Sequence, residues 1–383
     1  MCDILKHTTM KTGDKTMKKI HRTLSLFTVT AMCAALLCSC GAVSDSSQTD
    51  SSSKAATTTT ADTTADTTTT GEASSTASAT SAPDSSVSDS SSAVTDDTKT
   101  NGITPAMWKV TSPEGNTMVM LGSFHALKDE CYPLPEAVTN AYNNADILAV
   151  ECDITSTSED GEYMKNLMKQ MLYNDNTKLS QHISEEAYSA LQTYLSYWGM
   201  DISALEVYRP WAVSSTLDTL LIQDSDFDTE KGLDNFLLTT AHADGKEIYE
   251  VESVDFQMNL LINFSDDIYD LMFRSYKGET KESQKQALED LYTAWKSGDI
   301  ETFLEEDNEE ELAGYTEEDK KIAEDYNNQM LYDRNKNMAK AAEDLMSQGK
   351  NVFYVVGAAH YAGEGGIIDL LEKDGYTAER VQY

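Results

Sequence analysis

Basic residues are scarce in this sequence of 383 residues. Only 29 lysines and arginines stand against 65 aspartates and glutamates, which gives a formal net charge of −36. A chain this acidic repels the phosphates of DNA and RNA, so we expect no nucleic-acid partner. The length is enough for one large domain or two ordinary ones.

Cysteines are also few, and four of the six lie at or before Cys40. Only Cys131 and Cys152 remain for a folded domain. Outside the cell these two thiols either pair as a disulfide or serve as small buried apolar residues. The sequence also lacks a His-Glu-x-x-His motif, which excludes a conventional zincin.

The apolar run near the N-terminus is too short and wrongly flanked for a conventional membrane span. Residues 17–39 have a basic start, an apolar stretch and a small-residue end, which is typical of a secretory signal. The end of this segment, Leu37-Cys38-Ser39-Cys40, resembles the lipobox of bacterial lipoproteins. That resemblance implies cleavage before Cys40 and attachment of acyl chains, palmitate among them, to its sulfur. The alternative is an ordinary signal peptide.

These features predict how the chain is divided. Residues 1–16 are interpreted as a start-site extension, because the basic stretch begins only after them. Residues 40–101 are rich in Ser, Thr, Ala and Asp and lack the apolar content needed to offset chain entropy, so we expect a disordered tether. The folded domain is expected over 102–383. The whole arrangement predicts an extracytoplasmic protein held at the cell membrane by a lipid anchor.

The order of patterns in 102–383 predicts an α/β (α+β) fold. Residues 106–125 are typical of a hairpin, and the next strand and helix patterns form a βαβ unit with parallel strands. The middle of the domain is mostly helical, with a capping serine at Ser184, a proline at the first position of a helix at Pro210 and a stop at Gly245. We therefore expect a central mixed, largely parallel sheet flanked by helices, with a large helical insertion. Residues 246–253 are expected to form a further short buried strand.

Two strands end in the same way. The stretches "TMVMLGSFH" and "NVFYVVGAAH" each run through apolar residues to a glycine, Gly122 or Gly357, with His125 or His360 three residues later. Glycine lets the chain leave the sheet sharply, so that the histidine points back across its edge. An imidazole there serves either as a neutral metal ligand or as a general base, although a lone histidine is more often a core or capping residue.

Glu151 ends a third apolar strand, "DILAV". Parallel strands place their carboxyl ends at one edge, where open α/β sheets bind ligands, so Glu151 is expected beside His125. A carboxylate in such surroundings needs a cation, a metal or a histidine as partner. The alternative is a carboxylate that caps a helix or pairs with an arginine.

These motifs, together with "EKGLDNFLLTTAHADG", "RNKNMAKAAEDL" and the glycine-rich turn after His360, resemble the TraB/GumN family, which includes the Tiki proteases. The resemblance spans about residues 103–383. It matches the two Gly-x-x-His motifs and Glu151, and it adds Asp234 and Arg334-Asn335. It implies a metal-dependent peptidase, although some relatives are linked to blocking a peptide pheromone, and more distant ones include erythromycin esterases and a haem-binding group.

The resemblance implies a specific chemistry. His125, His360 and Glu151 would hold a divalent ion such as Mn²⁺, Co²⁺ or Zn²⁺, with Glu151 as general base or third ligand. Arg334 would stabilise the oxyanion or a substrate carboxylate, and Asn335 would orient it. In a metal-free version one histidine activates the water directly.

Each of the other candidates has a structural alternative. Arg334 and Asn335 could instead stabilise their own helix, while Asp234 and Glu252 are expected mainly to fix the structure. His182 and His242 lie on helical patterns without evident partners, so we expect surface or capping roles for them.

Two hypotheses about function follow. The first is a membrane-anchored hydrolase, a metal-dependent peptidase that acts on a peptide or protein substrate. The second is a binding lipoprotein that uses the same histidines to sequester a peptide, haem or a metal without turnover.

Overall fold

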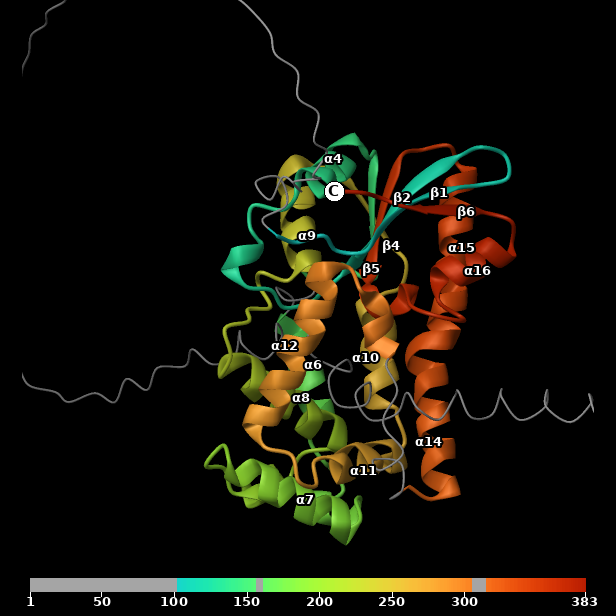
Figure 1. Cartoon of the computed structure of the whole chain (residues 1–383). Helices are drawn as coiled ribbons and strands as arrows, with labels where there is room; N and C mark the ends of the chain where they lie inside the picture. The colour runs from blue at the N-terminus through green and yellow to red at the C-terminus, as the bar shows by residue number, and fades with distance from the viewer. Residues whose placement is uncertain (1–101, 156–160, 305–314) are drawn as a thin grey trace, which may run out of the picture. The chain divides into compact units, whose positions relative to one another are not determined.

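The structure is a computed structural model that describes residues 102–155, 161–304 and 315–383 (Figure 1). The expected signal peptide, the expected lipidation of Cys40 and the expected tether fall in residues 1–101, outside the described residues, so they stay predictions. Among the helices that are described, none is both long and apolar enough to cross a bilayer.

One six-stranded sheet organises the domain, with the strand order β4-β3-β5-β2-β1-β6. Four neighbouring strands, β4, β3, β5 and β2, run parallel, and β1 pairs antiparallel with both β2 and β6. The expected mixed, largely parallel sheet is confirmed. The strands are β1 (Met107–Thr111), β2 (Thr117–Ser123), β3 (Ile147–Val150), β4 (Glu247–Glu250), β5 (Val352–Gly357) and β6 (Thr377–Arg380).

Helices cover the sheet and form the middle of the chain. Figure 1 shows α4 and α9 on one side of the sheet and α15 and α16 on the other, with the remaining α-helices gathered beyond the edge where β5 ends. The helices are α4 (Glu136–Asn144), α6 (Gly161–Gln170), α7 (Glu185–Ser196), α8 (Pro210–Gln223), α9 (Leu233–Asp244), α10 (Val254–Ile262), α11 (Asp266–Ser275), α12 (Lys281–Ser297), α14 (Glu317–Asn327), α15 (Asp333–Ser347) and α16 (Ile367–Lys373).

Local sequence explains where several of these helices begin and end. The Ser184 hydroxyl accepts a hydrogen bond from the Ala187 N–H and caps α7. Pro210 opens α8, where its missing N–H costs nothing, and Gly245 ends α9 in the left-handed conformation with φ of 67°. The predicted caps and stops of these three helices are confirmed.

Two buried apolar clusters make up the core. One surrounds the sheet and includes the whole of β3 and most of β5, where every residue is buried. The other lies within the helical middle, around residues such as Tyr194, Phe273 and Tyr326. Fully buried parallel strands have apolar side chains on both faces, which is why "ILAV" and "VFYVV" read as continuous apolar runs.

The prediction of a buried strand at residues 246–253 is only half right. A strand is present, β4, but it lies at the edge of the sheet, and three of its four residues are exposed. The charged residues Glu247 and Glu250 fit an edge position, because β4 pairs with β3 on one side and no described strand pairs with its other side.

Candidate active site

Three strands deliver the three predicted side chains to one edge of the sheet. β5 lies between β3 and β2 and runs parallel to both, so the carboxyl ends of all three strands meet. His125 follows the end of β2, Glu151 follows β3 directly and His360 lies in the 3₁₀ turn Ala358–Tyr361 after β5.

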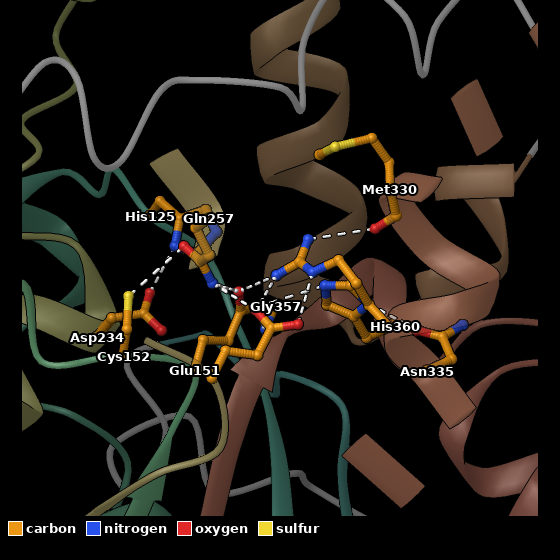
Figure 2. Close-up of polar contacts among 11 residues, drawn as sticks. His125, Glu151, Cys152, Asp234, Gln257, Met330, Asn335, Gly357 and His360 are labelled. Carbon is orange, nitrogen blue, oxygen red and sulfur yellow. Dashed lines mark hydrogen bonds and ion pairs between the residues drawn. The ribbon is translucent and has the colours of Figure 1, made fainter. Parts of the chain in front are cut away.

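Gly357 is the point around which these groups gather. Its N–H donates a 2.7 Å hydrogen bond to Glu151 Oε1. A β-carbon on Gly357 would lie 3.1 Å from Glu151 Oε1, 3.6 Å from His360 Cδ2 and 3.7 Å from His125 Nε2. The glycine therefore leaves the space in which the carboxylate and both imidazoles meet, rather than providing a positive φ for a sharp turn. In Figure 2, Glu151 lies between His125 and His360.

Both oxygens of the Glu151 carboxylate accept hydrogen bonds. Its Oε2 accepts hydrogen bonds from Arg334 Nη2 at 2.7 Å and from Gln257 Nε2 at 2.9 Å. Burial by itself would raise the pKa of Glu151, but the positive charges of Arg334 and His125 and the hydrogen bond from the Gly357 N–H outweigh it and lower the pKa well below the usual range. Glu151 is therefore an ionised carboxylate and a weak base.

Arg334 joins two carboxylates inside the protein. It lies on α15, is only 6% exposed, and donates to Glu252 through Nε and Nη2 at 2.8 Å each as well as to Glu151. Its Nη1 donates to the Met330 carbonyl at 3.2 Å. Burial opposes the charge, but the two carboxylates outweigh it and raise the pKa of Arg334. The guanidinium is thus committed to holding Glu151 and Glu252 in place.

His360 is buried and oriented by Asn335. The Nδ1 atom lies 2.6 Å from Asn335 Oδ1, while Asn335 Nδ2 donates to the Gly365 carbonyl at 2.9 Å. Because the amide oxygen is an acceptor, Nδ1 carries the proton and Nε2 presents a lone pair, 3.7 Å from Glu151 Oε1. Burial and the positive charge of Arg334 lower the pKa of His360 to about 3.

His125 has a different partner and a different charge. Its Nδ1 lies 2.8 Å from Asp234 Oδ2. Burial by itself would lower the pKa of His125, but the carboxylates of Asp234 and Glu151 outweigh it and raise the pKa to about 9. One imidazole is therefore charged and the other neutral near pH 7, which is how a site separates an acid from a base.

Gly232 explains how Asp234 reaches His125. A β-carbon at Gly232 would lie 2.1 Å from the His125 carbonyl oxygen, so only glycine permits this contact. The Leu233 N–H donates to the Phe124 carbonyl at 3.0 Å, which fixes the start of α9 against the end of β2. The Gly-Leu-Asp stretch therefore positions a carboxylate behind His125.

The structure thus brings together His125, Glu151, Arg334, Asn335 and His360, while their catalytic roles stay predictions. Sequence reasoning missed the part of Gln257, which links Glu151 to Glu252 with bonds of 2.9 and 2.8 Å. No motif marks Gln257, so no pattern in one sequence would have found it. Ser123 was also overlooked, although it lies within the first Gly-x-x-His motif.

Two other expectations about polar residues need correction. His182 and His242 do have partners: His182 Nδ1 lies 2.8 Å from Asp266 Oδ2, and His242 Nε2 lies 2.7 Å from Asp153 Oδ2. Both aspartates come from distant segments of the chain, so neither contact could be seen in the helical pattern. Neither histidine lines the cavity at the carboxyl edge of the sheet.

Cys131 and Cys152 are both buried, and no disulfide joins them. The Cys131 Sγ lies 3.1 Å from the Tyr292 hydroxyl, and Cys152 Sγ lies 3.5 Å from Gln257 Oε1. Burial raises the pKa of both thiols. They are therefore protonated small side chains, which is the second of the two alternatives.

His125 and His360 by themselves fit a divalent ion better than the predicted set of His125, His360 and Glu151 does. Both Nδ1 atoms are held by an oxygen, which is the usual support of a metal-binding histidine. His125 Nε2 lies beside Gly357, next to the Cδ2 edge of His360, and His360 Nε2 lies 3.7 Å from Glu151 Oε1. Glu151 is not a ready third ligand, because its oxygens already bind Arg334, Gln257 and Gly357. Within the described ranges, no three His, Cys, Asp or Glu side chains are arranged to hold an ion.

The fold and the site define an α/β protein in which two Gly-x-x-His motifs and an ion-paired glutamate meet at the carboxyl edge of a mixed sheet. The sequence model of the TraB/PrgY/gumN family matches residues 106–380. This chain belongs to the TraB/PrgY/gumN family.

Individual relatives are more distant. The chain is 26% identical over 157 residues to the uncharacterized protein YbaP of Escherichia coli (strain K12), which covers 41% of this chain and 56% of YbaP. It is 25% identical over 293 residues to a metalloprotease TIKI homolog of Nematostella vectensis, covering 65% of this chain and 61% of the homolog. Metalloprotease TIKI2 of Danio rerio is 25% identical over 164 residues, 38% of this chain and 32% of TIKI2.

The chain therefore spans less than two thirds of the length of these curated relatives. No solved structure matches it.

Proposed function

We propose that this protein is a hydrolase that acts on peptide or protein substrates at the carboxyl edge of its sheet. The observation that carries the proposal is the convergence of His125 Nε2, His360 and the Glu151 carboxylate around the space beside Gly357. Two of the relatives described above bear the name metalloprotease, which supports a hydrolytic reaction.

The hydrogen bonds favour specific roles for the two histidines. His360 presents a lone pair on Nε2 and takes a proton from a water whose oxygen attacks the scissile carbonyl carbon. His125 carries a proton that it gives to the leaving amine as the carbon–nitrogen bond breaks. The charge states described above agree with this assignment.

The contacts of Glu151 and Arg334 favour a role in supporting the two histidines. Since the Glu151 carboxylate is paired with Arg334, it is a poorer base than the His360 nitrogen. Among the described residues, the hydrogen bonds of the Arg334 guanidinium go to Glu151, Glu252 and the Met330 carbonyl, so it fixes the negative charge that faces the two imidazoles. Asn335 holds the His360 ring in one tautomer.

A second version of this proposal includes a divalent ion such as Mn²⁺, Co²⁺ or Zn²⁺, and in that version both histidines are neutral ligands instead of the acid and the base described above. His125 and His360 would hold it, and the names of the TIKI relatives support the idea. A bound ion polarises a carbonyl and lowers the pKa of a bound water.

A peptide screen tests the proposal. We expect the purified protein to cleave a mixed peptide library, with products identified by mass spectrometry, and to lose this activity in chelator and regain it with Mn²⁺, Co²⁺ or Zn²⁺. The metal content of the purified protein, measured by inductively coupled plasma mass spectrometry, is a second readout that does not depend on activity. Binding of peptide, haem or metal without any cleavage would instead favour the sequestering lipoprotein. Cleavage that is unaffected by chelator would refute the metal requirement and leave the proposed hydrolase activity supported.

The location of the protein is also a proposal, and it rests on the sequence of residues 17–40. We expect processing before Cys40 and acylation of its sulfur, so that the domain is held at the outer side of the cell membrane. The Cys40→Ser variant should then move from the membrane fraction to the soluble fraction, whereas Cys33→Ser should not. Equal membrane association of the two variants would refute the anchor.

A further inference from the structure

The cavity that contains the two histidines extends along an apolar wall. Its volume is about 80 Å³, which is room for several water molecules or for one amino-acid side chain. Leu288 and Leu291 of α12 line it, together with Met330 and Leu331. The two leucines are three residues apart on one helix, so they point to the same side.

The apolar wall is built into the same turn that holds Arg334. Met330 and Leu331 lie in the π-helix Asn328–Tyr332, which runs directly into α15. The Met330 carbonyl accepts a hydrogen bond from Arg334, while the Met330 side chain lines the cavity. Single π-helical turns occur frequently at functional sites. This turn therefore both accepts a hydrogen bond from Arg334 and contributes apolar residues to the cavity lining.

Few charged residues line the cavity. Among the described residues that line the cavity, the charged groups are those of the site: His125, Glu151 and Arg334. A charged substrate side chain placed against the leucines would be buried without a partner, which is costly. An apolar side chain of similar size would instead gain from burial.

Ser123 provides a second, independent observation in the same cavity. It is only 2% exposed, it lines the cavity, and its Oγ has no hydrogen-bond partner among the described residues. Ser123 pairs with Gly357 in the register of β2 and β5, so its side chain projects from the same face of the sheet on which the catalytic groups gather. Buried hydroxyls almost always have a hydrogen-bond partner, so an unpartnered one that lines a cavity calls for an explanation, and a bound ligand is one.

We infer that this cavity is a substrate subsite that binds a large apolar side chain next to the scissile bond, with the Ser123 hydroxyl donating a hydrogen bond to a carbonyl oxygen of the same peptide. The inference rests on the proposed peptide hydrolysis and specifies its substrate class. Leu288, Leu291, Met330 and Leu331 select the side chain, and Ser123 contacts the backbone, which every peptide has.

Blocked hexapeptides Ala-Ala-X-Ala-Ala-Ala test the apolar wall. We expect kcat/KM to be at least about 10-fold higher for X = Leu, Met or Phe than for X = Gly, Asp or Lys. In the Leu291→Ala variant the preferred residue X should shift from Leu toward Phe, because the smaller side chain enlarges the cavity. The ratio is measured within each variant, so it does not depend on how much protein is folded. Met168→Ala, a similar truncation at an exposed position outside the cavity, should keep the original ratio. Equal rates for Leu, Asp and Lys would overturn the inference.

Ser123→Ala tests the hydroxyl. We expect kcat/KM to fall about 10-fold for all apolar peptides alike. Because the hydroxyl has no partner inside the protein, its removal should leave the melting temperature unchanged or higher, whereas a structural hydroxyl would lower it. An unchanged kcat/KM for every peptide would overturn the role of Ser123.

A binding experiment separates this inference from the proposed function. The dissociation constants of the Leu and Asp peptides are measured by calorimetry on the His360→Ala variant, which need not turn them over. If no peptide is hydrolysed by the unaltered protein but the Leu peptide binds at least about 10-fold more tightly, the subsite stands and the hydrolase fails. If peptides are hydrolysed but Leu and Asp peptides bind equally, the hydrolase stands and the subsite fails.

Discussion

Replacing His360 with alanine should lower kcat/KM for peptide hydrolysis by about 10²–10⁴-fold, the range typical for the loss of a general base. The variant removes the Nε2 lone pair that faces Glu151 and the space beside Gly357, and no other neutral imidazole lines the cavity within the described residues. Steady-state kinetics with the best peptide of the screen measure the effect. His125→Ala should cause a comparable loss, because it removes the proton that the leaving amine needs.

The chain offers a matched control for these variants. His242 also lies within hydrogen-bond distance of an aspartate, but it lies outside the cavity. His242→Ala should therefore keep kcat/KM within about twofold of the unaltered protein, a change of under ~0.5 kcal/mol. Circular dichroism checks that all three variants are folded. A folded His360→Ala protein with full activity would rule out the proposed base.

Replacing Arg334 with methionine should lower the free energy of unfolding by about 3–5 kcal/mol, since it leaves two buried carboxylates without their cation. Glu151 and Glu252 each bind the Arg334 guanidinium, and their side chains are only 11% and 5% exposed. Methionine keeps most of the side-chain volume, so the loss reports charge rather than packing. Urea denaturation at pH 7 measures it.

The loss should depend on pH in a defined direction. The pKa of Glu151 in the folded protein is lowered below its ordinary value of 4.5, so its ion pair adds stability above pH 4.5 that is lost as the pH falls toward the folded-state pKa. The free energies of unfolding of the Arg334→Met variant and the unaltered protein should therefore become more similar below about pH 4.5.

An exposed lysine on the same helix is the control. Lys336 pairs with Asp333 at 2.8 Å, and both side chains are 64% exposed. Lys336→Met should change stability by less than about 0.5 kcal/mol, as most exposed pairs do. If both methionine variants unfolded at the same urea concentration, Arg334 would not be the cation that holds the two glutamates.

Much of the fold followed from local patterns. The apolar runs that became β2, β3 and β5 are long enough and continuous enough to indicate buried strands, and the βαβ order made β2 and β3 parallel. That argument placed His125 and Glu151 at one edge. It did not show that β5, from the far end of the chain, lies between them, because strand order depends on packing between distant segments.

The edge position of β4 was missed for the same reason. Its sequence, Glu247-Ile248-Tyr249-Glu250, is too short to show which side is buried, and only the assembled sheet shows that no described strand covers its outer side. The partners of His242 and His182 were missed likewise, because each aspartate comes from a segment more than 80 residues away in sequence.

By itself the sequence determined which chemical groups are available: two imidazoles and a carboxylate, each following an apolar strand, in a chain too acidic for nucleic acid. The tertiary structure decided what each group does. It paired Glu151 with Arg334, 183 residues away, and set Asn335 behind one histidine and Asp234 behind the other. The charge of a buried group depends on its burial and its nearest partners. Those exist only once the chain has folded, so two matching Gly-x-x-His motifs became one charged and one neutral histidine.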